Sequence, residues 1–161
     1  MPAQVAAPFL SNIMKVEKEW IDFNGHMNMA YYHLLFDRGV DDFYPTFGLT
    51  RDYITRAKHS TFLAESHIRY VKEVHVDDEV RVSTQVLGVD TKRLHLFNTL
   101  IQVKDNYVSA TSEDMVLSVD LSVRKVSPWP QDLLANLEAI RDAHATLPAP
   151  DGAGRRIGMQ K

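Results

Sequence analysis

Asp22-Phe23-Asn24-Gly25-His26-Met27-Asn28 is the segment of this chain that bears most directly on its fold. Before it, residues 13–20 alternate between the two sides of an extended chain, which predicts a strand. Asn and Gly then interrupt the alternation as turn formers. From residue 29 to about residue 47 apolar side chains recur at helical spacing, with Asn28 at the N-cap position and Pro45 near the far end. The segment is therefore predicted to be a turn between a strand and a long helix.

The rest of the chain changes its hydrophobic period from helical to strand-like. Residues 50–59 are predicted to hold one or two helical turns. Four runs of alternating apolar and polar residues follow, at 62–71, 80–86, 94–103 and 108–121. One face of the first run is predicted to hold Phe62, Ala64, Ser66, Ile68 and Tyr70. The spacing then predicts a closing helix over 131–144, and the Pro-, Gly- and Arg-rich tail from Leu147 is expected to be loosely ordered.

This order predicts an α+β fold. One long helix would pack against a curved antiparallel meander of four long strands, joined by the strand that precedes the turn. We expect a single domain over residues 1–161, with about five strands and a C-terminal helix. Such a sheet would leave an edge and an apolar face uncovered, so we expect a homodimer or homotetramer with its site near the subunit boundary.

Composition excludes several classes of protein. The chain has 161 residues, no cysteine and a net charge of −3, so it has no disulfide framework, thiol nucleophile or Cys-ligated zinc. Its basic residues form no long stripe, and we expect no nucleic-acid partner. No run is long enough to cross a bilayer, and the first ten residues lack the basic start of a signal peptide. We expect a cytoplasmic protein without a membrane partner.

The common catalytic and cofactor motifs are missing. There is no Gly-x-Ser-x-Gly elbow, no Gly-rich phosphate loop and no dinucleotide fingerprint. The seven His residues are scattered through the sequence without metal-ligand spacing. We therefore expect neither a cofactor nor a metal.

The turn before the long helix combines two groups that acyl transfer requires. The first N–H groups of a helix lack intrahelical acceptors and carry partial positive charge, so they can polarise a carbonyl and stabilise an oxyanion. Asp22, six residues before Asn28, could attack that carbonyl or activate a water. Gly25 would allow close backbone approach. The same residues also fit an ordinary turn followed by an ordinary N-cap.

The residues from Trp20 to Asn28, followed by Tyr31-Tyr32 and Phe36-Asp37, resemble the start of hotdog-fold acyl-CoA thioesterases of the 4-hydroxybenzoyl-CoA thioesterase type. That resemblance implies a hotdog fold, in which one helix is wrapped by an antiparallel sheet. It implies that Asp22 is the nucleophile or general base. It also implies that the polarising amide belongs to the first residues of the helix, Asn28 and Met29 among them.

Further segments resemble betainyl-CoA thioesterases of carnitine breakdown. They are Glu65–Tyr70, Gln85–Gly88, Asp90–His95, Ala110–Met115 and the ending around Gly154–Gly158. The resemblance implies hydrolysis of an acyl-CoA, with betainyl-CoA as the leading substrate. A hotdog enoyl-CoA hydratase or dehydratase and a non-catalytic acyl-CoA binding protein are the alternatives.

Other candidate residues carry two interpretations each. His26 could assist Asp22 or bind the substrate, or it could make a local hydrogen bond in the turn. Glu65 could orient water or the acyl group, or pair with Arg69 on the same strand face. Two basic residues, Lys92 and Arg93, stand at the start of a predicted strand. They could bind the phosphates of CoA, or they could simply lie in solvent at the edge of a hairpin. A trimethylammonium acyl group would need aromatic faces, and aromatic residues near the turn could form such a cage or simply the core: Trp20, Phe23, Tyr31, Tyr32 and Phe36.

Overall fold

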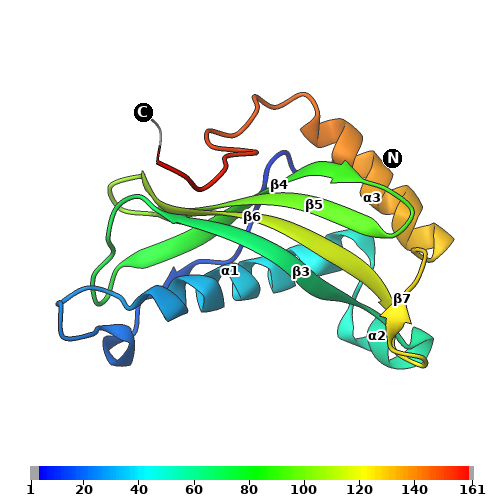
Figure 1. Ribbon diagram of the computed structural model, residues 1–161, viewed down its shortest axis with the longest axis horizontal. Coiled ribbons are helices and arrows are strands. Elements are labelled where there is room, and N and C mark those ends of the chain that lie inside the picture. The colour runs from blue at the N-terminus through cyan, green and yellow to red at the C-terminus, as the bar shows by residue number, and fades with distance from the viewer. Residues whose placement is uncertain (1–3, 160–161) are drawn as a thin grey trace.

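A computed structural model describes residues 4–159 of the chain. It confirms the α+β hotdog architecture, in which one antiparallel sheet curves around a long central helix, α1 (Figure 1). The elements follow in the order β1 (Phe9–Leu10), β2 (Met14–Lys15), η1 (Lys18–Trp20), α1 (Met29–Phe43), η2 (Tyr44–Phe47), α2 (Arg51–Ala57), β3 (His59–Tyr70), β4 (Glu79–Val89), β5 (Arg93–Gln102), β6 (Tyr107–Asp120), β7 (Lys125–Val126) and α3 (Gln131–His144). Within residues 4–159, no helix is long and apolar enough to span a membrane.

The length of the first predicted strand and the pairing of β3 both differ from the sequence-based expectation. The strand predicted over 13–20 is reduced to β2 and is followed by the 3-10 turn η1, which brings Trp20 into the core. The sheet runs β1-β4-β5-β6-β3, with β2 on β4 and β7 on β6. Only β4, β5 and β6 therefore form a meander, because β3 pairs with β6 instead of β4. Alternation in a sequence specifies which face a side chain takes, but not which strand lies beside it.

A β-bulge in β3 corrects the predicted face of that strand. The register with β6 shifts between Leu63 and Glu65, which leaves Ala64 as the extra residue. Leu63 pairs with the buried Val116. Thr61 and Leu63 consequently share the helix-facing side with Ser66, Ile68 and Tyr70, and Phe62 turns to the outer side. A bulge adds one residue to a period of two, so it exchanges the faces on one side of it.

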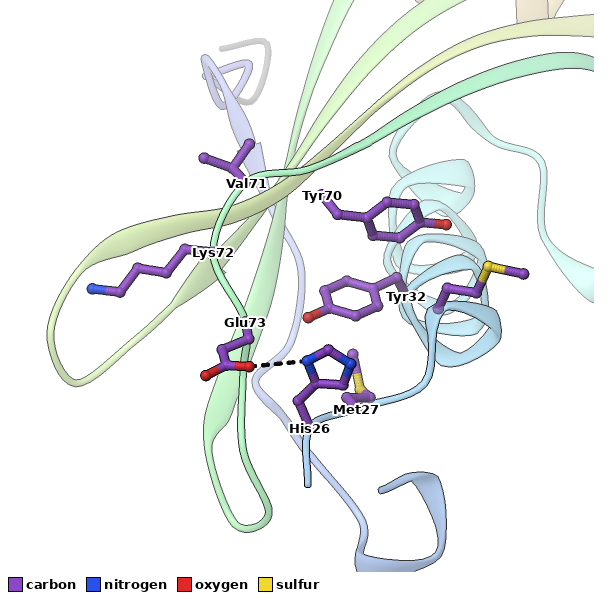
Figure 2. Close-up of a pocket in the computed structure, with 8 residues that line it drawn as sticks. His26, Met27, Tyr32, Tyr70, Val71, Lys72 and Glu73 are labelled. Atoms are coloured by element: carbon purple, nitrogen blue, oxygen red, sulfur yellow. Dashed lines mark hydrogen bonds and ion pairs between the residues drawn. The ribbon is translucent and has the colours of Figure 1, made fainter. Parts of the chain in front are cut away.

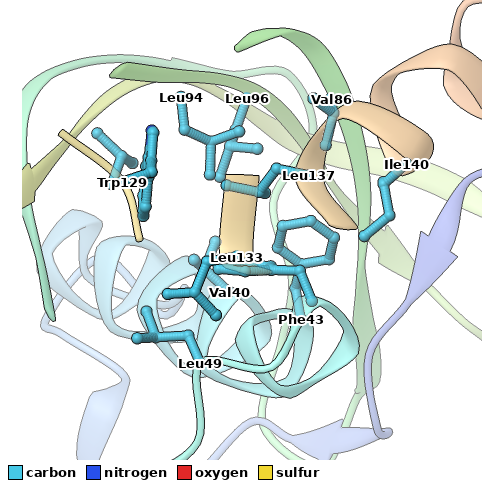
Figure 3. Packing of buried hydrophobic residues seen from close by; sticks show 12 residues of the cluster. Val40, Phe43, Leu49, Val86, Leu94, Leu96, Trp129, Leu133, Leu137 and Ile140 are labelled. Atoms are coloured by element: carbon cyan, nitrogen blue, oxygen red, sulfur yellow. The ribbon is translucent and has the colours of Figure 1, made fainter. Parts of the chain in front are cut away.

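Two groups of buried side chains fill the space between α1 and the sheet. Around the C-terminal half of α1, the apolar stripe of α3 meets helix and sheet together (Figure 3): Val40, Phe43, Leu94, Leu96, Leu133, Leu137 and Ile140. Around the N-terminal half, the segments that flank the turn pack against α1 and the sheet: Val16, Trp20, Met27, Tyr32, Leu35, Val82 and Leu100. The turn at residues 22–26 is thus anchored on both sides by core residues.

Helix α1 lies close to the sheet at Gly39. A Cβ atom added to this residue would overlap the Cβ of Val82 on β4. Both residues are buried in the middle of their elements. The helix can therefore lie this close to the sheet only because residue 39 has no side chain.

We expect Gly39→Ala to destabilise the protein by about 1–3 kcal/mol, as overpacking of a filled core does. Alanine is a better helix former than glycine by about 1 kcal/mol, so helix propensity alone would make the variant more stable. A loss of stability would therefore show the steric clash with Val82. Urea denaturation monitored by circular dichroism would measure it. Asp41→Ala, on the exposed side of the same helix, is the control and should leave stability unchanged or slightly higher. Equal or greater stability of Gly39→Ala would contradict this packing argument.

Candidate active site at the N-terminus of the long helix

The turn at residues 22–26 is a tight hairpin loop, as its sequence predicts. Gly25 N–H donates to Asp22 O at 3.0 Å, and Asp22 N–H donates to His26 O at 3.1 Å. Gly25 has a φ of 80°, the left-handed conformation that closes a three-residue hairpin loop and favours glycine. Ile21 and Met27 form a bridge directly behind the loop. Asp22 and His26 therefore face each other across the mouth of the hairpin.

The Asp22 carboxylate is half-buried and is fixed by two donors. Its Oδ1 accepts from Asn24 N–H at 2.8 Å, the usual contact of an Asp at the start of a turn. Its Oδ2 accepts from the Asn28 side-chain amide Nδ2 at 3.3 Å. Asn28 Oδ1 in turn accepts from Ala30 N–H at 3.0 Å, which confirms Asn28 as the N-cap of α1. One asparagine side chain thus caps the helix and orients the carboxylate.

The N–H of Met29 is the free donor of the first turn. Asn28 N–H donates to Trp20 O at 2.9 Å, and Tyr31 N–H donates to Asn28 O at 3.1 Å. The Asn28 side chain occupies Ala30 N–H, whereas none of the hydrogen bonds among residues 4–159 involves Met29 N–H. A donor at a helix N-terminus attracts partial negative charge, so it can hold a carbonyl oxygen or an oxyanion.

A cavity of about 220 Å³ opens beside this first turn (Figure 2). The hairpin, α1 and the end of β3 with its following loop supply its walls: His26, Met27, Met29, Tyr32, Tyr70, Val71, Lys72 and Glu73. The Tyr32 and Tyr70 rings meet edge to face, with centroids 5.2 Å apart. Burial raises the pKa of Tyr32, so its phenol stays neutral in the physiological range.

The cavity also holds a carboxylate–imidazole pair. His26 Nδ1 and Glu73 Oε2 are 2.9 Å apart, and His75 Nε2 lies 3.2 Å from Glu73 Oε1 (Figure 2 shows the first contact). The hydrogen bond from His26 lowers the pKa of Glu73, and His75 adds to the effect. Glu73 is therefore ionised at neutral pH.

Tyr70 and Glu73 line this cavity but were not among the candidates from the sequence. The alternation in the sequence placed Tyr70 on one strand face with Ser66 and Ile68, and the structure shows that this face lies toward α1. That alternation is the signal that could have identified it. Glu73 lies in the loop between β3 and β4, 47 residues after His26. Nothing in the local sequence connects these two positions, because only the fold brings the loop to the hairpin.

The aromatic candidates do not gather around one space. Phe23 is 97% exposed at the tip of the hairpin. The rings of Trp20 and Tyr31 stack 5.3 Å apart, and the Arg38 guanidinium lies 5.5 Å from the Trp20 ring. Phe36 is buried in the core. Of the five aromatic candidates, Tyr32 alone lines the cavity beside Met29.

The basic candidates lie at the other end of the sheet. Arg93 pairs with Leu117 on β6, whereas Tyr70 pairs with Ala110, seven residues along the same strand. At about 3.3 Å per residue, that separation is roughly 23 Å. Arg93 forms an ion pair with Asp90 at 2.6 Å. Within one subunit, Lys92 and Arg93 are therefore not brought together with Asp22.

Glu65 lies on the outer face of the sheet, away from α1. It borders a second cavity of about 260 Å³ with His67, His95, Glu113 and Arg155. No ion pair between Glu65 and Arg69 is found in the described part of the chain. The tail crosses this outer face (Figure 1), where Gly154 N–H donates to Glu113 Oε2 at 2.7 Å. Asp22 and Glu65 are therefore on different faces of the subunit.

Comparison with known proteins supplies the context for this arrangement. Residues 16–137 match the family described as the thioesterase-like superfamily. The chain is 38% identical over 141 residues to a betainyl-CoA thioesterase of Pseudomonas aeruginosa, a match that covers 88% of this chain and 89% of that protein. It is 37% identical to an L-carnitine dehydrogenase/betainyl-CoA thioesterase of Rhizobium meliloti, covering 91% of this chain but only 29% of that longer protein.

The solved structures include a similar protein with a ligand. A Staphylococcus aureus protein solved in complex with CoA superimposes with a TM-score of 0.88 and 26% sequence identity. The match covers 99% of this chain and 100% of that one. The similarity thus extends over the sheet, α1 and the hairpin that precedes it.

Proposed function

The chain belongs to the thioesterase-like superfamily and hydrolyses acyl-CoA thioesters, and we propose that its substrate is betainyl-CoA and that Asp22 is its reactive carboxylate. The observation that carries this proposal is the half-buried Asp22, fixed by Asn24 and Asn28 beside the free N–H of Met29. A nucleophile or base and an oxyanion donor adjoin each other there, as acyl transfer requires.

The geometry gives each group a role. The thioester carbonyl accepts a hydrogen bond from Met29 N–H, and the N-terminal end of α1 stabilises the negative charge that develops on its oxygen. The Asp22 carboxylate then either bonds to the carbonyl carbon, so that CoA leaves as a thiolate, or takes a proton from an attacking water. Both routes require Asp22 to be ionised.

Asp22→Asn should lower the turnover of betainyl-CoA by at least about a hundredfold, because the variant loses the charge but keeps an oxygen that can accept from Asn24 N–H. Free-thiol release measures turnover, and the melting temperature should stay close to that of the parent. Asp142→Asn, which removes an exposed carboxylate from α3, is the matched control with parental activity. Parental turnover by Asp22→Asn would remove Asp22 from the mechanism.

The cavity beside Met29 suits the betainyl group. In this group a single methylene separates the carbonyl carbon from a trimethylammonium nitrogen, so the cation must lie close to the oxyanion donor. The Tyr32 and Tyr70 rings wall the cavity at this point. A cation over an aromatic ring gains about 0.5–2 kcal/mol. We therefore assign recognition of the cation to these two rings.

A neutral substrate of the same shape, 3,3-dimethylbutanoyl-CoA, isolates the contribution of the charge. We expect kcat/KM for betainyl-CoA to exceed that for the neutral thioester by roughly 2- to 30-fold, the range that 0.5–2 kcal/mol allows. Tyr70→Leu should reduce this ratio and leave the neutral substrate little affected. Equal kcat/KM values for both substrates with the parental enzyme would speak against betainyl-CoA.

We also propose that the working unit is at least a homodimer joined through β3. Among residues 4–159, β3 pairs only with β6, so its other edge is open, whereas β1 and β2 cover part of β4. Phe62 and Leu63, next to the bulge at mid-strand, are 42% and 48% exposed. An open apolar edge favours pairing with a second copy. Two-fold pairing centred near Ala64 would bring Lys92 and Arg93 of the partner subunit to about the level of Ser66, because Arg93 lies at the level of Phe62 in its own subunit. Along the strands, these residues of the partner subunit would then be closer to Tyr70 than the same residues of its own subunit, and CoA phosphates could reach them there.

Leu63→Glu should convert a dimer into a monomer, because it puts two like charges at the proposed two-fold axis. Sedimentation velocity at micromolar concentration measures the change. Val123→Glu introduces the same charge at an exposed apolar residue in the turn before β7, and this control should remain dimeric. A parental protein that sediments as a monomer would overturn the proposal.

A further inference from the structure

Asp22 and His26 occupy opposite positions at the mouth of the hairpin. The Ile21–Met27 bridge and the bond from Asp22 N–H to His26 O make residues 22 and 26 the next antiparallel pair. Side chains of such a pair project to the same side, with Cβ atoms about 5 Å apart. His26 also lines the cavity beside Met29. The imidazole therefore adjoins both the reactive carboxylate and the space for the acyl group.

Glu73 fixes the orientation and the tautomer of His26. The carboxylate of Glu73 accepts from Nδ1 at 2.9 Å (Figure 2), so in the neutral ring Nδ1 is the nitrogen that carries the proton and Nε2 is the one with the lone pair. The loop that holds Glu73 is itself secured, because the Tyr107 hydroxyl donates to Glu73 O at 2.9 Å. This is the arrangement in which a carboxylate orients an imidazole base.

Asp22 and His26 differ in their fitness as bases. Both oxygens of Asp22 already accept hydrogen bonds, from Asn24 and Asn28, and these contacts hold the carboxylate in one orientation, as a nucleophile requires. Imidazole is the side chain that exchanges protons near neutral pH. The two groups are therefore suited to different steps of one reaction.

Resting on the thioesterase function proposed above, we infer that Asp22 is the nucleophile and that His26, held by the positioning residue Glu73, activates the water that releases the acyl group. In the first step an Asp22 oxygen bonds to the acyl carbon, the C–S bond breaks and CoA leaves as a thiolate. In the second step a water gives a proton to His26 Nε2 and its oxygen bonds to the acyl carbon. The bond to Asp22 breaks, the free acid leaves, and the imidazolium passes its proton to the thiolate.

Several titratable groups face this pair and belong to its pH response. Glu73 also contacts His75, which lies 3.9 Å from Asp78. The others come from the hairpin, α1, the end of β3 with its loop, and β6: Asp22, Tyr32, Tyr70, Lys72 and Tyr107. Among the described residues, Tyr32, Tyr70, Lys72 and Tyr107 form no hydrogen bond or ion pair with the His26 ring.

Rapid mixing of enzyme with betainyl-CoA, followed by free-thiol detection, tests the division of steps. With His26→Ala we expect a burst of close to one thiol per site and then a steady rate reduced by about 10²- to 10⁴-fold, because the acyl-enzyme forms but waits for water. Glu73→Gln should lower kcat by roughly tenfold or more. It should also move the acidic limb of the kcat–pH profile to lower pH, because the imidazolium loses the carboxylate that stabilises it.

Two further variants separate a positioning role from a structural one. His75→Asn removes the other partner of Glu73 and should keep parental kinetics. The double variant His26→Ala/Glu73→Gln should be no slower than His26→Ala, since Glu73 acts only through His26. Additive losses, an unmoved pH profile in Glu73→Gln, or a His26→Ala enzyme with no burst would each overturn the inference. Absence of thiol release by the parental protein would instead overturn the proposed function.

Discussion

Contact between α1 and the concave face of the sheet is the constraint on which the other parts of the molecule depend. Gly39 lies so close to Val82 that a single added carbon atom would overlap it, and this tight fit restricts how far the helix can shift or turn above the sheet. With α1 fixed there, its first residue, Met29, comes to the end of the sheet where β3 finishes and the loop toward β4 begins. A shift of α1 by a residue would separate the Met29 N–H from Tyr70 and Glu73. Packing at the middle of the helix therefore determines the geometry at its end.

At the N-terminus of α1, the groups that cap the helix are also the groups that position the proposed reactive carboxylate. A helix start leaves N–H donors without acceptors, and most proteins satisfy them with caps or water. Here Asn28 caps Ala30 and also holds Asp22, and no acceptor among residues 4–159 takes the Met29 N–H, the donor that we propose binds the substrate carbonyl. The left-handed Gly25 closes the hairpin that brings Asp22 back beside the helix. An ordinary turn and the proposed active site are thus compatible interpretations of this segment, because the hydrogen bonds that close the turn also hold Asp22 beside the start of α1.

A single subunit holds only part of what an acyl-CoA would contact. The groups that we propose act on the thioester lie in one place, whereas Lys92 and Arg93 lie at the far end of the sheet and Glu65 lies on the outer face. The open edge of β3 lies between these regions. Edge pairing between two copies relates opposite ends of the sheet by symmetry, which is how residues distant in one chain can serve one ligand.

The sequence by itself determined the α+β class, the start of α1, the extent of α3, the four long strands, the N-cap at Asn28 and the turn that holds Asp22. It placed the end of the long helix near residue 47, whereas α1 ends at Phe43 and the 3-10 helix η2 follows. These features follow from local physics, since hydrophobic period, capping and turn chemistry act over a few residues. Tertiary structure decided the rest. It paired β3 with β6, moved Phe62 to the outer face through one bulged residue, and drew Trp20 and Tyr31 into a stack while Phe23 stayed in solvent. It also brought Glu73 to His26 and Tyr70 to Tyr32. Such contacts join residues that are far apart along the chain, and only burial of the whole core selects one set of them.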